Sequence, residues 1–157
     1  MEGPNLLLTR IDNRLVHGQV GMTWTKTLGA NLIIVADDVT AEDTLQQSMM
    51  SFTAKSAGAG IRFFSLEYTA SIIGNAAPDQ KIFIVVRTPA DARKLVELGV
   101  PIKDINVGNM HFTNGKRAIT KKVYVDDKDL EDLQFLASKG INVYCQDVPG
   151  EAIEKIQ

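Results

Sequence analysis

Hydrophobic residues come in short runs at fairly even intervals along this chain, and helix-length stretches with polar turns separate most of them. Each run has the length of one β-strand, and several are apolar at consecutive positions, which is typical of parallel strands covered by helices on both faces. The pattern predicts strands at residues 6–8, 32–36, 61–64, 82–86, 105–107, 123–125 and 141–145. It predicts helices within residues 18–29, 40–55, 66–76, 88–99 and 126–140.

The alternation of strands and helices predicts an α/β fold, with residues 1–157 as one domain. Its centre is an open, mostly parallel twisted sheet with helices on both faces. Capping signals support the helices, because Thr88 can cap a helix that begins with proline and Asp126 or its neighbour can cap the last one. Between residues 107 and 120 the pattern breaks, so we expect a loop there with a short extra strand.

The composition is that of an ordinary globular protein and excludes several classes of function. The 157 residues include 17 basic and 19 acidic side chains, a balance that lacks the broad positive field of nucleic-acid-binding proteins. Cys145 is the only cysteine, so no internal disulfide forms and a reducing cytoplasm is the expected location. The start MEGPN has no targeting leader, and apolar runs such as LIIVA are too short to cross a bilayer. We therefore expect no direct membrane insertion.

Motifs for common cofactor chemistry are missing from the sequence. There is no G-x-G-x-x-G after the first strand, no P-loop, no G-x-S-x-G nucleophile elbow and no H-E-x-x-H. Two widely separated histidines and a single cysteine also disfavour a metal site. We expect no cofactor and no metal.

The stretch TRIDNRLVHGQV places His17 directly after the first predicted strand, before a glycine where a helix begins. Ligands of open α/β sheets bind in such strand-to-helix loops. Arg10 and Arg14 bring two guanidinium groups, which suit a phosphate beside a helix N-terminus. Asp12 can hold one imidazole tautomer through a ring N–H, which leaves the other nitrogen free as a nucleophile. Such a loop fits a phosphohistidine carrier.

The same residues are equally compatible with a structural role, in which the arginines and Asp12 pair with one another and His17 packs at the helix start. A different class of function is an anion- or small-molecule-binding regulatory module that never forms a covalent intermediate. A nucleotide-binding protein ranks last, because its phosphate-loop glycines are missing. Spacing alone does not decide between these hypotheses.

The segment RIDNRLVHGQV resembles the signature of the IIB components of the mannose/fructose/sorbose family of the phosphoenolpyruvate-dependent sugar phosphotransferase system. Three further stretches resemble the same family and with it cover most of the chain: GANLIIVADDVTAEDTLQQSMM, RTPADARKLVELGV and INVGNMHFTNGKRAIT. Within them, AEDTLQQ and NVGNMH are most similar to the N-acetylgalactosamine-specific members.

The resemblance implies a cytoplasmic phosphotransferase with a mostly parallel α/β fold. A IIA protein would phosphorylate His17, with Nδ1 as the favoured atom, and His17 would pass the phosphoryl group to a sugar bound by membrane IIC and IID partners. The sugar is an amino sugar or a hexose, with N-acetylgalactosamine as one candidate. The resemblance is also compatible with a homodimer.

Around His17 we expect Arg10 and Arg14 to contact the phosphate and Asp12 to orient the loop or the imidazole. The supporting hydrogen-bond groups are Asn13, Gly18 and Gln19. The loop at Arg87 and Thr88 approaches the same site if its strand neighbours the first one.

Other conspicuous residues favour structural roles. His111 is expected to pack or hydrogen-bond locally in its loop, and Trp24 to anchor the core or an interface. Met49 and Met50 are expected to be helix core or flexible packing, and Cys145 a small buried hydrophobe.

Overall fold

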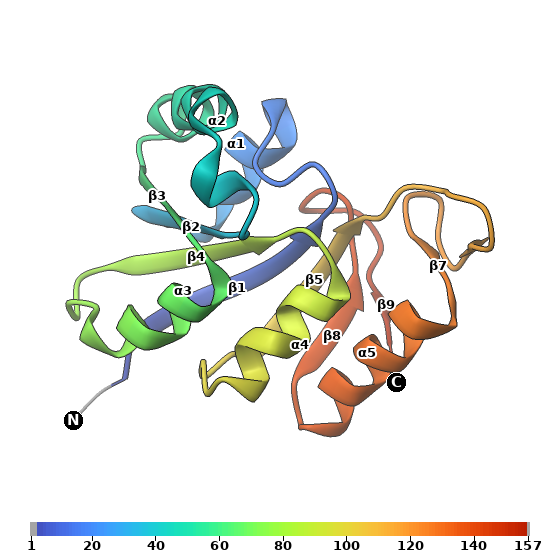
Figure 1. Cartoon of the computed structure of the whole chain (residues 1–157). Helices are drawn as coiled ribbons and strands as arrows, with labels where there is room; N and C mark the ends of the chain where they lie inside the picture. Colours follow the sequence, from blue (N-terminus) through green and yellow to red (C-terminus); the bar gives the residue numbers. More distant parts are fainter. Residues whose placement is uncertain (1–2, 157) are drawn as a thin grey trace.

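A computed structural model, described here for residues 3–156, shows a seven-stranded sheet in the order β3-β2-β4-β1-β5-β8-β9 (Figure 1). The strands are parallel except for β9, which pairs antiparallel with β8. Their bounds are β1 Asn5–Asp12, β2 Leu32–Ala36, β3 Gly60–Phe64, β4 Lys81–Val86, β5 Asp104–Asn109, β8 Asn142–Cys145 and β9 Glu154–Lys155. The expected open, mostly parallel α/β sheet is confirmed.

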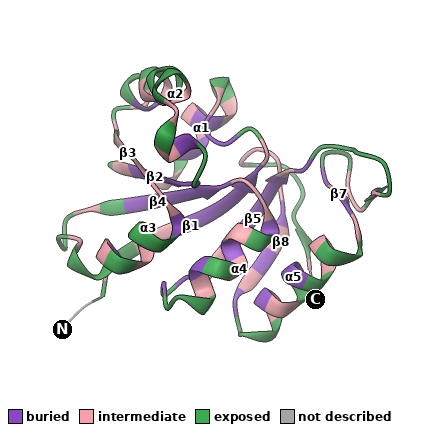
Figure 2. Cartoon of the chain, viewed as in Figure 1, coloured by how far each residue is buried: buried purple, intermediate pink, exposed green. Residues whose placement is uncertain are grey.

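Helices cover both faces of the sheet, and each face has its own core. The helices are α1 Gly18–Leu28, α2 Thr44–Ser56, α3 Leu66–Ile72, α4 Pro89–Glu97 and α5 Asp127–Ser138, with 3₁₀ turns η1 Thr40–Glu42 and η2 Ile73–Asn75. Trp24 of α1 and Met50 of α2 pack into one core, and α3, α4 and α5 contribute residues to the other. The central strands are buried between these layers except at their N-terminal ends, whereas the outer sides of the helices are exposed (Figure 2).

The helix ends follow the capping signals in the sequence. Thr88 caps α4, because its hydroxyl accepts a hydrogen bond from the Asp91 backbone N–H at 3.2 Å, and Pro89 follows at the first helical position. Asp126 and Asp129 form a reciprocal capping box at the start of α5. These contacts confirm two predicted helix starts.

We predict that Thr88→Ala lowers the free energy of unfolding by about 1 kcal/mol, because the Asp91 N–H loses its partner in the first turn of α4. Urea denaturation of the folded chain measures this change. Thr113→Ala is the matched control, since Thr113 lies exposed in a loop. A loss no larger than that of the control would contradict the capping role.

One predicted strand differs from the structure, and one strand of the structure was not predicted. The run at 123–125 forms only β7 Tyr124–Val125, which pairs with β6 Arg117–Ala118 in a separate two-stranded hairpin outside the main sheet. The last strand, β9, consists of two exposed polar residues that carry no hydrophobic signal. The predicted extra strand between 107 and 120 is β6.

Two buried residues confirm their expected structural roles. Trp24 is 4% exposed and donates its indole N–H to the Asp147 carbonyl oxygen at 2.8 Å. Cys145 lies at the end of β8, where burial, with a contribution from Glu154, raises the pKa of its thiol to about 11. A thiol with so high a pKa is a poor nucleophile at neutral pH.

Candidate functional site

His17 lies at the C-terminal edge of the sheet, where β1 ends and α1 begins. The five residues between the end of β1 and Gly18 turn tightly, and the Leu15 N–H donates to the Asp12 carbonyl oxygen at 2.9 Å. Leu15 has a φ of 58°, an uncommon left-handed conformation that its buried side chain helps to hold. The turn brings His17 to the N-cap of α1, with its side chain 17% exposed.

The imidazole of His17 contacts a buried carboxylate. Its Nε2 lies 3.1 Å from Oδ2 of Asp12, which is fully buried. Burial opposes ionisation of Asp12, but hydrogen bonds from His17 and the Arg14 N–H and the charge of Arg10 outweigh it, so the pKa of Asp12 is lowered. An ionised carboxylate only accepts hydrogen bonds, so Nε2 carries the hydrogen in this contact. In neutral His17 the lone pair is therefore on Nδ1.

Arg10 lies below this pair and is 2% exposed. Its guanidinium donates to Asp12 Oδ2 from Nε at 3.3 Å and from Nη2 at 3.1 Å, and to Asn106 Oδ1 at 2.6 Å. Burial lowers the pKa of Arg10, although Asp12 and Asp147 oppose the effect, and a guanidinium stays charged at neutral pH. Arg10 is therefore placed to hold Asp12. We expected Arg10 to contact a phosphate, but its side chain lies beneath the surface.

The same guanidinium joins two further parts of the chain to the site. Its Nη1 donates to the carbonyl oxygens of Gln146 at 3.2 Å and Asp147 at 2.9 Å, just after β8. It also lies against the face of Gly108 in β5, where a Cβ atom would overlap the guanidinium itself. Three neighbouring strands, β1, β5 and β8, thus fix the position of Arg10, and Arg10 fixes Asp12.

The exposed polar groups of the loop are Arg14, Gly18 and Gln19. Within residues 3–156 the Arg14 guanidinium makes no hydrogen bond or ion pair, so it is available to an anion. Arg14, His17 and Gly18 line one side of a groove of about 460 Å³, and Gln46, Met49 and Thr53 of α2 line the other. The lining contains no carboxylate.

Asn13 ties the His17 loop to two other loops. Its Nδ2 donates to the Arg87 carbonyl oxygen at 2.8 Å, and its Oδ1 accepts from the His111 N–H at 2.7 Å. Arg87 returns a hydrogen bond to the Asn13 carbonyl oxygen, so the loop after β4 reaches the site as expected from the pairing of β4 with β1. His111 is an exposed loop residue whose backbone bonds to Asn13, in line with the expected local role.

A second buried carboxylate, that of Asp37, holds Arg87 beside the His17 loop. Asp37 accepts hydrogen bonds from Arg87 Nη2 at 3.1 Å and from the Thr40 hydroxyl at 2.7 Å. Burial opposes ionisation of Asp37, but these hydrogen bonds outweigh it and lower its pKa. Arg87 is thereby held between the loop after β2 and the His17 loop.

Sequence reasoning missed Asn106, Gly108 and Asp147, which fix Arg10. It also gave Met49 the wrong environment, because Met50 is buried but Met49 is 66% exposed. Across residues 3–156 no three His, Cys, Asp or Glu side chains gather as a metal-ion site. No helix in the same range has the length and apolar character needed to cross a membrane.

A family model described as the PTS system sorbose subfamily IIB component matches residues 6–157. The chain belongs to this family. It is 62% identical to the N-acetylgalactosamine-specific phosphotransferase enzyme IIB component 1 of Escherichia coli K12, over 99% of both chains. The crystal structure of the PTS system N-acetylgalactosamine-specific IIB component 1 from Escherichia coli has a TM-score of 0.95 and 61% identity, covering 98% of this chain and 100% of that one.

A longer relative combines two components in its name. The chain is 34% identical to the PTS system mannose-specific EIIAB component of Escherichia coli K12, over 93% of this chain but 46% of that protein. IIB components are phosphotransferases of sugar phosphotransferase systems, and they work with IIA and membrane IIC and IID partners. The resemblance seen in the sequence is therefore confirmed at the level of the family.

Proposed function

We propose that this IIB component is a cytoplasmic phosphocarrier that accepts a phosphoryl group on His17 from a IIA phosphohistidine and passes it to a sugar. The identity of 62% to an N-acetylgalactosamine-specific IIB component supports N-acetylgalactosamine as that sugar. The observation that carries the proposal is the contact of 3.1 Å between His17 Nε2 and the buried Asp12 carboxylate, in a loop that leaves His17 part-exposed.

The contact supports Nδ1 of His17 as the reacting atom. Asp12 binds the Nε2–H, so the Nδ1 lone pair of His17 attacks the phosphorus of the IIA phosphohistidine. An N–P bond forms at Nδ1 as the N–P bond of the donor breaks, and the donor imidazole keeps the electron pair. The phosphorylated imidazole of His17 is positively charged while Nε2 keeps its hydrogen, and the Asp12 carboxylate stabilises that charge. In the second step a sugar hydroxyl oxygen attacks the same phosphorus and releases its proton to water. The N–P bond breaks, and Nδ1 keeps the electron pair, which restores neutral His17.

Groups that bind the phosphoryl oxygens are close to His17. Gly18 begins α1, so the first backbone N–H groups of this helix have no intrahelical acceptor and favour an anion. Gly18 has a φ of 46°, which glycine adopts without strain. The guanidinium of Arg14, which has no side-chain partner among residues 3–156, adds a positive charge on the same groove. Phosphoryl transfer needs mainly positioning and charge stabilisation, and these groups supply both.

The test is phosphorylation of the purified chain by phosphoenolpyruvate, the two general phosphotransferase proteins and a cognate IIA, read by intact mass. Wild type is expected to gain one acid-labile phosphoryl group, and His17→Gln none. His111→Gln is the matched control and is expected to be phosphorylated like wild type. If wild type gains no mass while the IIA is phosphorylated, the carrier is excluded and a non-covalent anion-binding module remains.

A further inference from the structure

Helix α2 exposes more large apolar side chains than it buries. Only Met50 and Ala54 of its thirteen residues are buried, whereas Leu45, Met49 and Phe52 are 72%, 66% and 75% exposed. These three residues, spaced by four and three positions, lie in one line along the outer side of the helix and are called the α2 stripe below. An ordinary surface helix has the opposite arrangement, with its apolar side on the core.

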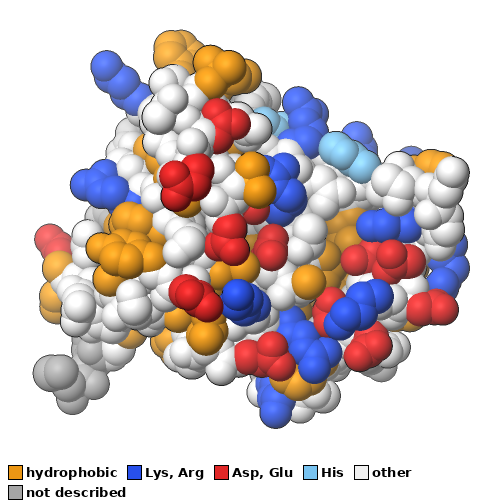
Figure 3. All heavy atoms as spheres, in the orientation of Figure 1, with side chains coloured by type: hydrophobic (Ala, Val, Ile, Leu, Met, Phe, Trp, Pro, Cys, Tyr) orange, Lys and Arg blue, Asp and Glu red, His pale blue; other side chains and the backbone are white. Residues whose placement is uncertain are grey.

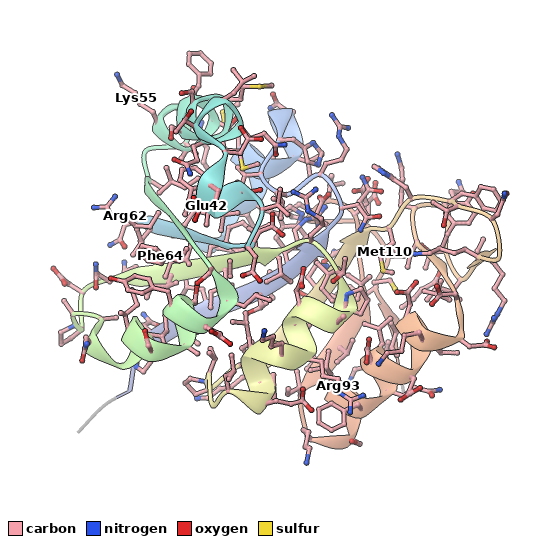
Figure 4. All side chains as sticks on the ribbon, viewed as in Figure 1. Glu42, Lys55, Arg62, Phe64, Arg93 and Met110 are labelled. Carbon is pink, nitrogen blue, oxygen red and sulfur yellow. The ribbon has the colours of Figure 1, made fainter. Side chains whose placement is uncertain are left out.

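The composition of α2 is also unusual for a helix that faces water. Its sequence TLQQSMMSFTAKS contains a single charged residue, Lys55, near its end (Figure 4). Helix α5 of the same protein, DKDLEDLQFLAS, exposes the charged side chains of Asp127, Lys128 and Glu131 and buries Leu133 and Leu136. Hydrophobic side chains gather on the surface over α2 at the top of the view in Figure 3. Exposed methionine and aromatic residues with few charges are typical of the core of a protein interface.

The α2 stripe is continuous with the His17 site. Met49 belongs to the stripe and also lines the groove of about 460 Å³ whose other wall contains Arg14 and His17. A protein that covers the stripe therefore reaches the imidazole of His17. The lining of the groove includes the guanidinium of Arg14 and no carboxylate, so the groove is complementary to an anion.

We propose that the α2 stripe is the docking surface for the IIA phosphodonor, an inference that rests on the phosphocarrier function proposed above. Before His17 is phosphorylated, the groove lining offers Arg14 and no carboxylate, so it fits a partner that presents a phosphohistidine. The sugar-bearing membrane partners meet the chain after phosphorylation, when the phosphoryl group already compensates Arg14. Cytoplasmic loops of membrane proteins are also rich in lysine and arginine, which disfavours them beside this groove.

The test compares the rate of phosphoryl transfer from phosphorylated IIA to the full chain carrying Leu45→Gln, Phe52→Gln or both. Neither residue lines the groove, and glutamine adds no charge that would repel the phosphoryl group. The double variant is expected to lose at least tenfold in kcat/KM at limiting IIA and still to reach one phosphoryl group per chain at saturating IIA. Its urea midpoint is expected to stay that of wild type, because both side chains are exposed.

Leu98→Gln is the matched control, since Leu98 is 44% exposed at the end of α4 on the other face of the sheet. This variant is expected to accept the phosphoryl group at the rate of wild type.

Transfer by the double variant within twofold of wild type would overturn the docking proposal and leave the phosphocarrier function intact. A defect confined to the later transfer to sugar, with IIC and IID in membranes, would also overturn it and assign the stripe to those partners. If wild type is a dimer, the double variant is a monomer and the rate of transfer from IIA is the same for both, the stripe is the contact surface for a second copy of the chain. Wild type that accepts no phosphoryl group at any IIA concentration would instead refute the phosphocarrier function.

Discussion

Gly108→Ala is expected to lower the free energy of unfolding by about 3–5 kcal/mol, the cost of breaking a buried ion pair, and to abolish phosphorylation of His17. A Cβ atom at residue 108 would occupy the space of the Arg10 guanidinium, and the buried strand β5 cannot move away from it. Arg10 would then lose its hydrogen bonds to Asp12 and Asn106. Urea denaturation and intact mass after incubation with phosphorylated IIA measure the two effects.

A double-mutant cycle tests the reason for this effect. If the alanine acts by displacing Arg10, then Gly108→Ala should cost much less in an Arg10→Ala background, where no guanidinium is left to displace. Gly74→Ala is the matched control, because a Cβ at residue 74 meets no atom within 4 Å. This variant is expected to have the same free energy of unfolding as wild type. Equal costs of Gly108→Ala in the wild-type and Arg10→Ala backgrounds would show that Arg10 is not responsible.

The main strands and the helices were predictable because their signals are local. Apolar runs marked β2 and β4, and Thr88 and Asp126 marked two helix starts. Strand β9 was not predictable, since two exposed polar residues form it only because they pair with β8. The outward side of α2 was not predictable either, because a methionine in a helical pattern is usually taken to face the core.

The site was predictable only in part. The loop containing His17 is contiguous in the sequence, and its match to a family signature singled it out. The burial of Arg10 depends on which strands neighbour β1, and its partners Asn106 and Asp147 are distant in the sequence. Strand order is a long-range property that hydrophobic periodicity does not contain, so Arg10 and Arg14 looked equivalent although only Arg14 is exposed.

Asp12→Asn is expected to slow phosphoryl transfer to His17 on the order of 10²-fold or more. It is also expected to lower the free energy of unfolding, because the buried Arg10 guanidinium loses the charge of its partner but keeps an oxygen acceptor of the same shape. Asparagine has nearly the same shape as aspartate but carries no negative charge, and its amide oxygen takes the place of Oδ2, which accepts from Arg10 as well as from His17. A neutral amide oxygen binds the Nε2–H less strongly than a carboxylate does, so a larger share of neutral His17 carries its hydrogen on Nδ1, where no lone pair is then left for attack. The charge that compensates the phosphorylated imidazole is also lost. The rate is measured by rapid quench with phosphorylated IIA.

A structural defect would slow transfer as well, so the decisive measurement is the tautomer of neutral His17. The ¹⁵N chemical shifts of its ring at alkaline pH are expected to show mainly hydrogen on Nε2 in wild type and an increased share on Nδ1 in Asp12→Asn. Asp79→Asn, in an exposed loop, should match wild type in both tautomer and rate. If wild-type His17 carried its hydrogen on Nδ1, the contact with Asp12 would not prepare Nδ1 for attack, and Nε2 would become the atom to examine for phosphorylation.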